Sequence, residues 1–135
     1  MRIVLDTNVL ISGIFFGGSS HHILQAWKQK KIQFVISQEI YTEYTRVAEV
    51  ISKKYPEIDI SEILNLIAIY SEIVQSYVLS EQVCEDPDDD KFIACAISNE
   101  VKYIVSGDKH LLRLSGYHDI RVMKPQEFCT EFLKC

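Results

Sequence analysis

Acidic side chains follow two segments that a parallel sheet would place side by side. Asp6 comes directly after the apolar run 3–5, and Asp108 follows the apolar run 103–105 after two small residues. Neither run alternates between apolar and polar residues, which is typical of strands buried on both faces. In an open parallel sheet, ligands bind beyond the carboxyl ends of the strands. We therefore expect both aspartates at one edge of the sheet.

A third group of acids lies in the stretch Glu85–Asp90, which holds five of the 19 acidic residues within six positions. Asp86 is suited to cap a helix, and Pro87 suits the first helical position because no N–H donor is needed there. The helix that begins here feeds the strand 103–105, so its start lies at the carboxyl edge of the sheet. The acids 88–90 are therefore expected near the two aspartates, although one or two of them could simply complement the positive end of the helix.

Glu43 is the fourth candidate, because of its place on a predicted helix. The apolar stripe of that helix is formed by Ile40, Tyr44, Val47, Ala48 and Ile51. At about 100° per residue, Glu43 lies roughly 85° from the centre of the stripe and Glu39 about 125° from it. Glu43 is thus expected to reach inward near the same sheet edge, whereas Glu39 is expected to face water.

Together these carboxylates indicate a divalent cation. Each acid alone has a simpler use as a turn, cap or solvated residue. Like charges within a few ångströms repel one another unless a cation lies between them, and ligands that are all oxygen favour Mg²⁺ or Mn²⁺ over zinc. Such an ion can hold phosphate oxygens and activate water. The chain has neither a Walker A loop nor a GxGxxG motif, which argues against nucleoside triphosphates and dinucleotides as ligands.

Strand-like runs alternate with helical patterns along the whole chain. We expect a single α/β domain over residues 1–135, a three-layer α/β/α sandwich with a mainly parallel, Rossmann-like central sheet. The expected strands are 2–5, 32–36, 77–79, 103–105 and 120–123. The expected helices are 20–29, one from Ser37 that ends before Pro56, 60–74, 86–97, 109–114 and one that starts at Pro125.

Charge and cysteine content limit the class of protein. The 135 residues carry a net charge of −5, but outside the stretch 85–90 the numbers of acidic and basic residues are equal, so the acidity is local. No apolar run reaches the ~18–20 residues that would span a bilayer, and we expect a cytoplasmic protein. The four cysteines (Cys84, Cys95, Cys129 and Cys135) form no CxxC pair or other zinc spacing, so we expect no metal or redox role for them.

Four segments in this order resemble the PIN domain family of nucleases over essentially the whole chain. They are Ile3-Val4-Leu5-Asp6-Thr7-Asn8-Val9-Leu10, Ser37-Gln38-Glu39-Ile40-Tyr41-Thr42-Glu43-Tyr44, Asp86-Pro87-Asp88-Asp89-Asp90-Lys91-Phe92 and Tyr103-Ile104-Val105-Ser106-Gly107-Asp108. The resemblance implies that Asp6, Glu43, Asp108 and one acid of the 88–90 run hold one or two Mg²⁺ or Mn²⁺ ions. Counting back from Ile93-Ala94-Cys95-Ala96, Asp90 best matches the family position, with Asp89 as the alternative.

The resemblance also implies supporting residues. Asn8 resembles the polar residue that braces the end of the first strand through hydrogen bonds. Ser106 resembles the small hydroxyl residue that often precedes the last acid. The basic side chains expected near the site would either contact the substrate backbone or remain solvated; they are Lys91, Lys109, His110 and Arg113.

The implied activity is that of a metal-dependent endoribonuclease acting on single-stranded RNA. The most similar branch of the family contains toxins of prokaryotic toxin–antitoxin pairs, which implies an antitoxin protein and a second copy of the chain as partners. The alternative is a catalytically weak PIN-like module that acts through protein or RNA binding. A phosphatase of the haloacid dehalogenase type is disfavoured because Asn8 stands where that family needs a second aspartate.

Overall fold

The computed structural model describes residues 1–76, 82–84 and 86–135 and contains one parallel sheet. Its strands follow the order β3-β2-β1-β4-β5, and every neighbouring pair is parallel. The strands are β1 (Arg2–Leu5), β2 (Gln33–Ser37), β3 (Glu72–Val74), β4 (Tyr103–Val105) and β5 (Arg121–Met123). This architecture confirms the predicted α/β class with a parallel central sheet.

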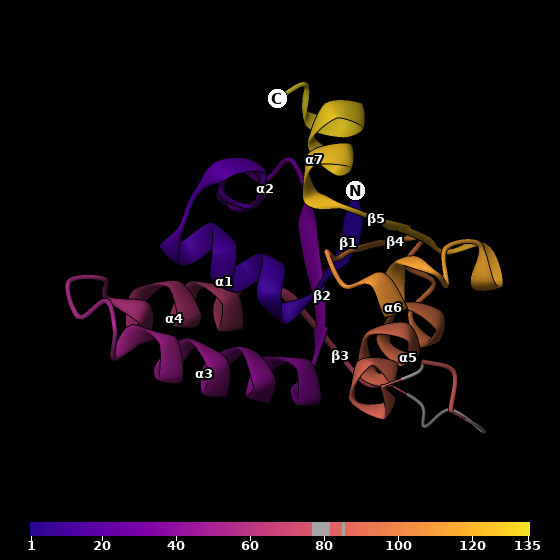
Figure 1. Ribbon diagram of the computed structural model, residues 1–135, viewed down its shortest axis with the longest axis horizontal. Helices are drawn as coiled ribbons and strands as arrows, with labels where there is room; N and C mark the ends of the chain where they lie inside the picture. The colour runs from indigo at the N-terminus through magenta and orange to yellow at the C-terminus, as the bar shows by residue number, and fades with distance from the viewer. Residues whose placement is uncertain (77–81, 85) are drawn as a thin grey trace.

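Helices cover both faces of the sheet and complete the three layers. Figure 1 shows α1 and α2 on one side of β1 and β2, and α5 on the other. The α-helices are α1 (Thr7–Phe15), α2 (Gly18–Lys28), α3 (Gln38–Ser52), α4 (Ile60–Tyr70), α5 (Asp90–Ser98), α6 (Lys109–Leu112) and α7 (Pro125–Phe128). Short turns of other types are η1 (Pro87–Asp89), η2 (Tyr117–Asp119) and the π-helical η3 (Cys129–Leu133). Within the described residues, none of the helices combines the length and apolarity needed to cross a membrane.

The order of the strands reverses at β1. From β1 the chain builds β2 and β3 on one side and then returns to place β4 on the other side of β1. Leu5 at the end of β1 pairs with Val105 at the end of β4, so both strands stop at the same level. Open α/β sheets bind ligands at such a reversal, beyond the carboxyl ends of the strands. The fold therefore brings the residues after β1 and β4 to the same edge of the sheet.

Two predicted helix caps are present. The Ser37 hydroxyl accepts a hydrogen bond from the backbone N–H of Ile40 at 3.3 Å, which starts α3 directly at the end of β2. The Asp86 carboxylate accepts from the backbone N–H of Asp88 at 3.0 Å, with Pro87 at the first position of η1. Both caps start helical segments at the carboxyl edge of the sheet, as the sequence predicts.

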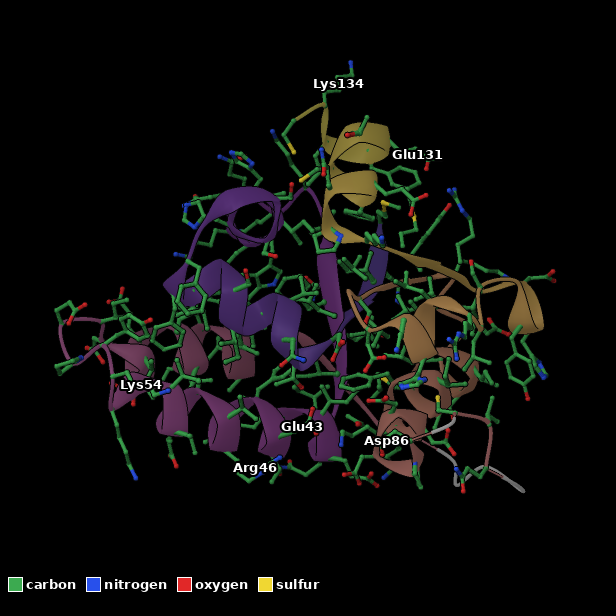
Figure 2. All side chains as sticks on the ribbon, viewed as in Figure 1. Glu43, Arg46, Lys54, Asp86, Glu131 and Lys134 are labelled. Carbon is green, nitrogen blue, oxygen red and sulfur yellow. The ribbon has the colours of Figure 1, made fainter. Side chains whose placement is uncertain are left out.

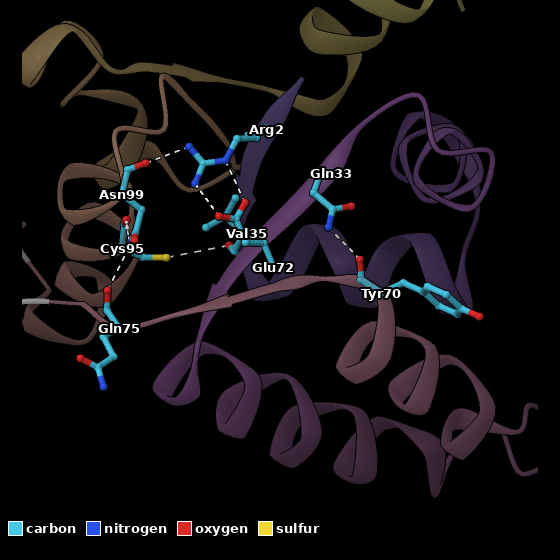
Figure 3. A network of polar contacts seen from close by, with 8 residues as sticks. All are labelled: Arg2, Gln33, Val35, Tyr70, Glu72, Gln75, Cys95 and Asn99. Atoms are coloured by element: carbon cyan, nitrogen blue, oxygen red, sulfur yellow. Dashed lines mark hydrogen bonds and ion pairs between the residues drawn. The ribbon is translucent and has the colours of Figure 1, made fainter.

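The predicted helix 60–74 is wrong beyond Tyr70. Residues 72–74 form the edge strand β3, whose Ile73 pairs with Ile36 of β2. The Arg2 guanidinium holds this strand, since Nε lies 2.9 Å from Glu72 Oε2 and Nη2 lies 3.0 Å from Oε1 (Figure 3). The strand predicted at 77–79 lies outside the described residues.

The start of α2 also differs from the prediction. The helix begins at Gly18, two residues before the expected start, and Ser20 is buried inside it instead of capping it. Gly13 of α1 lies against this segment, because a Cβ added there would stand 2.8 Å from the Ser20 carbonyl oxygen. The absence of a side chain at Gly13 thus permits the close approach of α1 and α2.

Candidate metal centre

Asp6 and Asp108 are connected through a buried hydroxyl. Asp6 follows β1 and is 5% exposed. The fully buried Ser106 donates from Oγ to Asp6 Oδ2 at 2.6 Å and accepts from the backbone N–H of Asp108 at 3.0 Å. Asp108 also caps α6, since its Oδ1 accepts from the backbone N–H of His110 at 2.7 Å. Ser106 therefore fixes the position of one acid relative to the other.

Glu43 reaches the same region from the first turns of α3. Its Oε2 accepts a hydrogen bond from the Thr7 hydroxyl, and its Oε1 lies 2.7 Å from Lys91 Nζ. The side chains of Glu43 and Lys91 are only 19% and 15% exposed. Figure 2 shows Glu43 on the part of α3 that lies near α5, whereas Arg46 points outward. Glu39, as expected from the helical period, is exposed.

The two adjacent acids at the start of α5 have different surroundings. The Asp90 carboxylate accepts from the backbone N–H groups of Val83 at 3.1 Å and Cys84 at 2.6 Å. Asp89 Oδ2 is buried and has no hydrogen-bond partner within the part of the chain that the structure describes. Asp90 thus holds the segment before η1, and Asp89 is the acid with an unsatisfied oxygen.

The charges of the other acids act on Asp89. Burial, followed by the charges of Asp108 and Asp6 and a smaller effect of Glu43, raises the pKa of Asp89 to about 6. Burial likewise raises the pKa of Asp6, and the charges of Asp108 and Glu43 act in the same direction against the opposing hydrogen bond from Ser106. Because each charge disfavours ionisation of the others, a cation among them would be bound favourably. The donor set, all carboxylate oxygens with one buried oxygen unsatisfied, fits Mg²⁺ or Mn²⁺.

The predicted supporting residues differ in their environments. Asn8 is exposed on the first turn of α1, and among the described residues its side chain makes no hydrogen bond. The contact between the end of β1 and α3 comes instead from Thr7 through Glu43. Lys109 is exposed at the start of α6, while Lys91 lies on Glu43.

The sequence reasoning missed two residues that position the site, Thr7 and Tyr44. Thr7 directly follows Asp6, and Tyr44 was assigned to the apolar stripe that also identified Glu43. Tyr44 is fully buried, and its hydroxyl donates to the backbone carbonyl of Leu5. This bond joins α3 to the last residue of β1, immediately before Asp6. Burial, with the charge of Asp6 next, raises the pKa of Tyr44 well above its ordinary value, so the hydroxyl remains a donor.

Tyr44→Phe is expected to destabilise the protein by about 1–2 kcal/mol, because the buried carbonyl of Leu5 loses its donor. Urea unfolding measures the change, which should appear as a lower midpoint at an unchanged m value. Tyr41→Phe is the matched control. The Tyr41 hydroxyl donates to the Leu64 carbonyl at 3.2 Å in a half-buried position where water can replace it, so the loss should be smaller. Equal losses in the two variants would contradict the role of Tyr44.

A family model described as a PIN domain matches residues 2–110 of the chain. This range includes the ends of β1 and β4, the first turns of α3 and the start of α5, and hence all of the acids described above. No curated protein matches the chain.

Proposed function

The chain belongs to the PIN domain family, and from this premise we propose that it is a metal-dependent endoribonuclease that hydrolyses phosphodiester bonds of single-stranded RNA. PIN domains are in general nucleases, and the proposed metal dependence is supported by one observation above the others. Asp89 has a buried, unsatisfied carboxylate oxygen, and the charges of Asp108, Asp6 and Glu43 all act on this residue. We further propose that the protein is the toxin of a toxin–antitoxin pair.

Asp6, Glu43, Asp89 and Asp108 would hold one or two Mg²⁺ or Mn²⁺ ions. A divalent cation in this position supplies charge stabilisation to phosphate oxygens and lowers the pKa of water. Asp90, the better match to the family position by sequence, accepts two backbone N–H groups instead. We assign it to positioning the start of α5, with direct ligation as the alternative.

The neighbouring residues keep the acids in place before the substrate arrives. Ser106 holds Asp6 through one of its oxygens, and Thr7 and Lys91 hold the two oxygens of Glu43. Because these contacts fix side chains that are largely buried, little rearrangement is needed when a charged substrate binds. Lys91 and the exposed Lys109 are the cations that we assign to the phosphate backbone.

Removal of divalent metal is expected to abolish cleavage. A labelled single-stranded RNA should be cut in the presence of Mg²⁺ or Mn²⁺, and the rate should fall by at least about 100-fold in EDTA. Readdition of the metal should restore the rate, and circular dichroism should show that the protein stays folded throughout. Double-stranded RNA and single-stranded DNA serve as substrate controls. Cleavage at the same rate in EDTA would overturn the assignment.

A folded, metal-loaded protein that binds RNA without cleaving it would favour the alternative, a PIN-like module that acts through binding. The predicted partners, an antitoxin protein and a second copy of the chain, stay predictions, as does the cytoplasmic location. The described residues contain one apolar edge at which a protein could bind, formed by Ile69, Tyr70 and Ile73. These side chains are 68%, 56% and 52% exposed at the end of α4 and on β3.

A further inference from the structure

Three side chains with sulfur or imidazole ligand atoms lie close together, away from the acids at the carboxyl edge of the sheet. They are His22 of α2, Cys129 at the start of η3, and Cys135. The ligand atoms of the three residues all lie within 4.8 Å of one another. More than a hundred positions separate His22 from the cysteines, so no short motif in the sequence reveals the cluster. The expectation that these cysteines have no metal role was based on sequence spacing alone.

The cluster combines one fixed residue with two that can adjust. Cys129 is 1% exposed, and its thiol donates to the Ser19 carbonyl of α2 at 3.4 Å. His22 and Cys135 are both exposed, and the His22 ring has no hydrogen-bond partner among the described residues. The neighbouring His21, in contrast, is within hydrogen-bond distance of the Gly13 carbonyl and the Gln25 amide. His22 is therefore available as a ligand, and the exposed pair can close around an ion that Cys129 anchors.

We propose that His22, Cys129 and Cys135 form a second metal site, which binds Zn²⁺. Two thiolates and one imidazole are a typical protein ligand set for zinc, and three protein ligands leave the fourth tetrahedral position to water. The acids of the proposed nuclease centre offer oxygen donors only, which favour magnesium or manganese, so the two sites would select different metals. On binding, each thiol releases its proton to the solvent, and the ion forms bonds to both sulfur atoms and to one ring nitrogen.

The position of the cluster indicates what zinc would do. Figure 2 shows Lys134, next to Cys135, at one end of the molecule, and Glu43 and Asp86 at the other. The turn η3 packs against α2, and the Cys129–Ser19 hydrogen bond already joins the two segments. An ion shared by His22 and the two cysteines would fasten the C-terminal segment to α2. The proposed zinc site would therefore link the C-terminal segment to α2, and it is separate from the proposed nuclease centre.

Cobalt titration tests the site independently of RNA cleavage. Co²⁺ added to the protein in a buffer with a non-thiol reductant should produce the thiolate-to-cobalt charge-transfer absorption, which carboxylate ligands cannot give. The absorption should saturate at one ion per chain and disappear when Zn²⁺ displaces the cobalt. Zn²⁺ alone should raise the Tm of the protein.

Variants at the two exposed ligands make the test specific. His22→Ala and Cys135→Ser should each weaken cobalt binding by on the order of 100-fold, since even the loss of an outer hydrogen-bond partner costs 10–100-fold. Neither residue is in the core, so both variants should fold. His118→Ala, which removes another exposed histidine, should bind cobalt like the wild type. A reduced wild-type protein without the absorption, or an absorption unchanged in both ligand variants, would overturn the proposal.

Discussion

Asp6→Asn is expected to lower the rate of RNA cleavage by on the order of 10²–10³-fold, the usual cost of losing one electrostatic contact in an active site. The amide keeps the shape of the side chain and can still form a hydrogen bond with Ser106, but it removes the negative charge of a buried acid. Glu43→Gln and Asp108→Asn should have losses of the same order. Initial rates on an end-labelled single-stranded RNA, at saturating Mg²⁺, measure the effect. Equal activity of the wild type and Asp6→Asn would exclude the proposed site.

Two exposed acids provide matched controls for this series. Glu39 lies four residues before Glu43 on α3 but is exposed, and Asp88 lies beside Asp89 and is also exposed. Glu39→Gln and Asp88→Asn each remove one charge from the same elements, and both should cleave RNA within about twofold of the wild-type rate, since surface substitutions away from special features have small effects. A comparable loss in these controls would mean that total negative charge matters and that the individual acids do not.

Asp89 and Asp90 should respond differently to the same change. Asp89→Asn is expected to lose activity as Asp6→Asn does. Asp90→Asn weakens the acceptor for the backbone of Val83 and Cys84, and it should destabilise the protein by about 1–3 kcal/mol with a smaller loss of activity at temperatures where it is folded. A larger loss of activity in Asp90→Asn than in Asp89→Asn would indicate that Asp90 is the direct metal ligand.

The choice between these two acids shows where sequence reasoning becomes inadequate. That Asp6 and Asp108 share an edge was predictable, because parallel strands of a buried sheet end at the same edge, as the pairing of Leu5 with Val105 shows. The direction of Glu43 was predictable too, because α3 is a regular helix of 15 residues. The segment 87–89, however, is a 3₁₀ turn that leads into α5. A 3₁₀ turn advances by about 120° per residue and an α-helix by about 100°, so counting back along the helix does not fix which of the two side chains faces the other acids.

Contacts between distant segments explain why the predicted helix 60–74 ends early. The apolar period of the segment 60–74 fits a helix throughout, but the chain leaves the helix after Tyr70. Glu72 meets Arg2 of β1, 70 positions away, and Ile73 pairs with β2. Pairing with β2 and Arg2 stabilises the strand conformation, and this contribution cannot be read from helix propensity or local periodicity. The proximity of His22 to the C-terminal cysteines likewise depends on a tertiary contact, the packing of α2 against η3.

Asp89→Asn is also expected to stabilise the metal-free protein at neutral pH. Because burial and the neighbouring acids raise the pKa of Asp89 from 3.8 to about 6, the folded protein binds this proton more tightly than the unfolded chain does. Stability from this group is therefore fully present below pH 4 and is lost as the pH rises to about 6. At a site without solvent, a pKa rise of this size would lower the free energy of unfolding by about 3 kcal/mol when Asp89 ionises. Solvent reaches the half-buried side chain and reduces this loss to roughly 2 kcal/mol.

Urea unfolding in EDTA measures this effect. The free energies of unfolding of the wild type and of Asp89→Asn are determined at pH 4 and at pH 7. The difference between the two proteins at pH 4 is then compared with their difference at pH 7. The difference should shift by roughly 2 kcal/mol in favour of the variant at pH 7. Saturating Mg²⁺ should reverse the order at pH 7, because only the wild type has the full set of ligands and gains the full stabilisation from binding. A stability difference that is independent of pH would mean that Asp89 is not buried among the other acids. If Asp89→Asn also loses RNA cleavage, the expected result would show that the Asp89 carboxylate lowers the stability of the metal-free protein and is needed for metal binding.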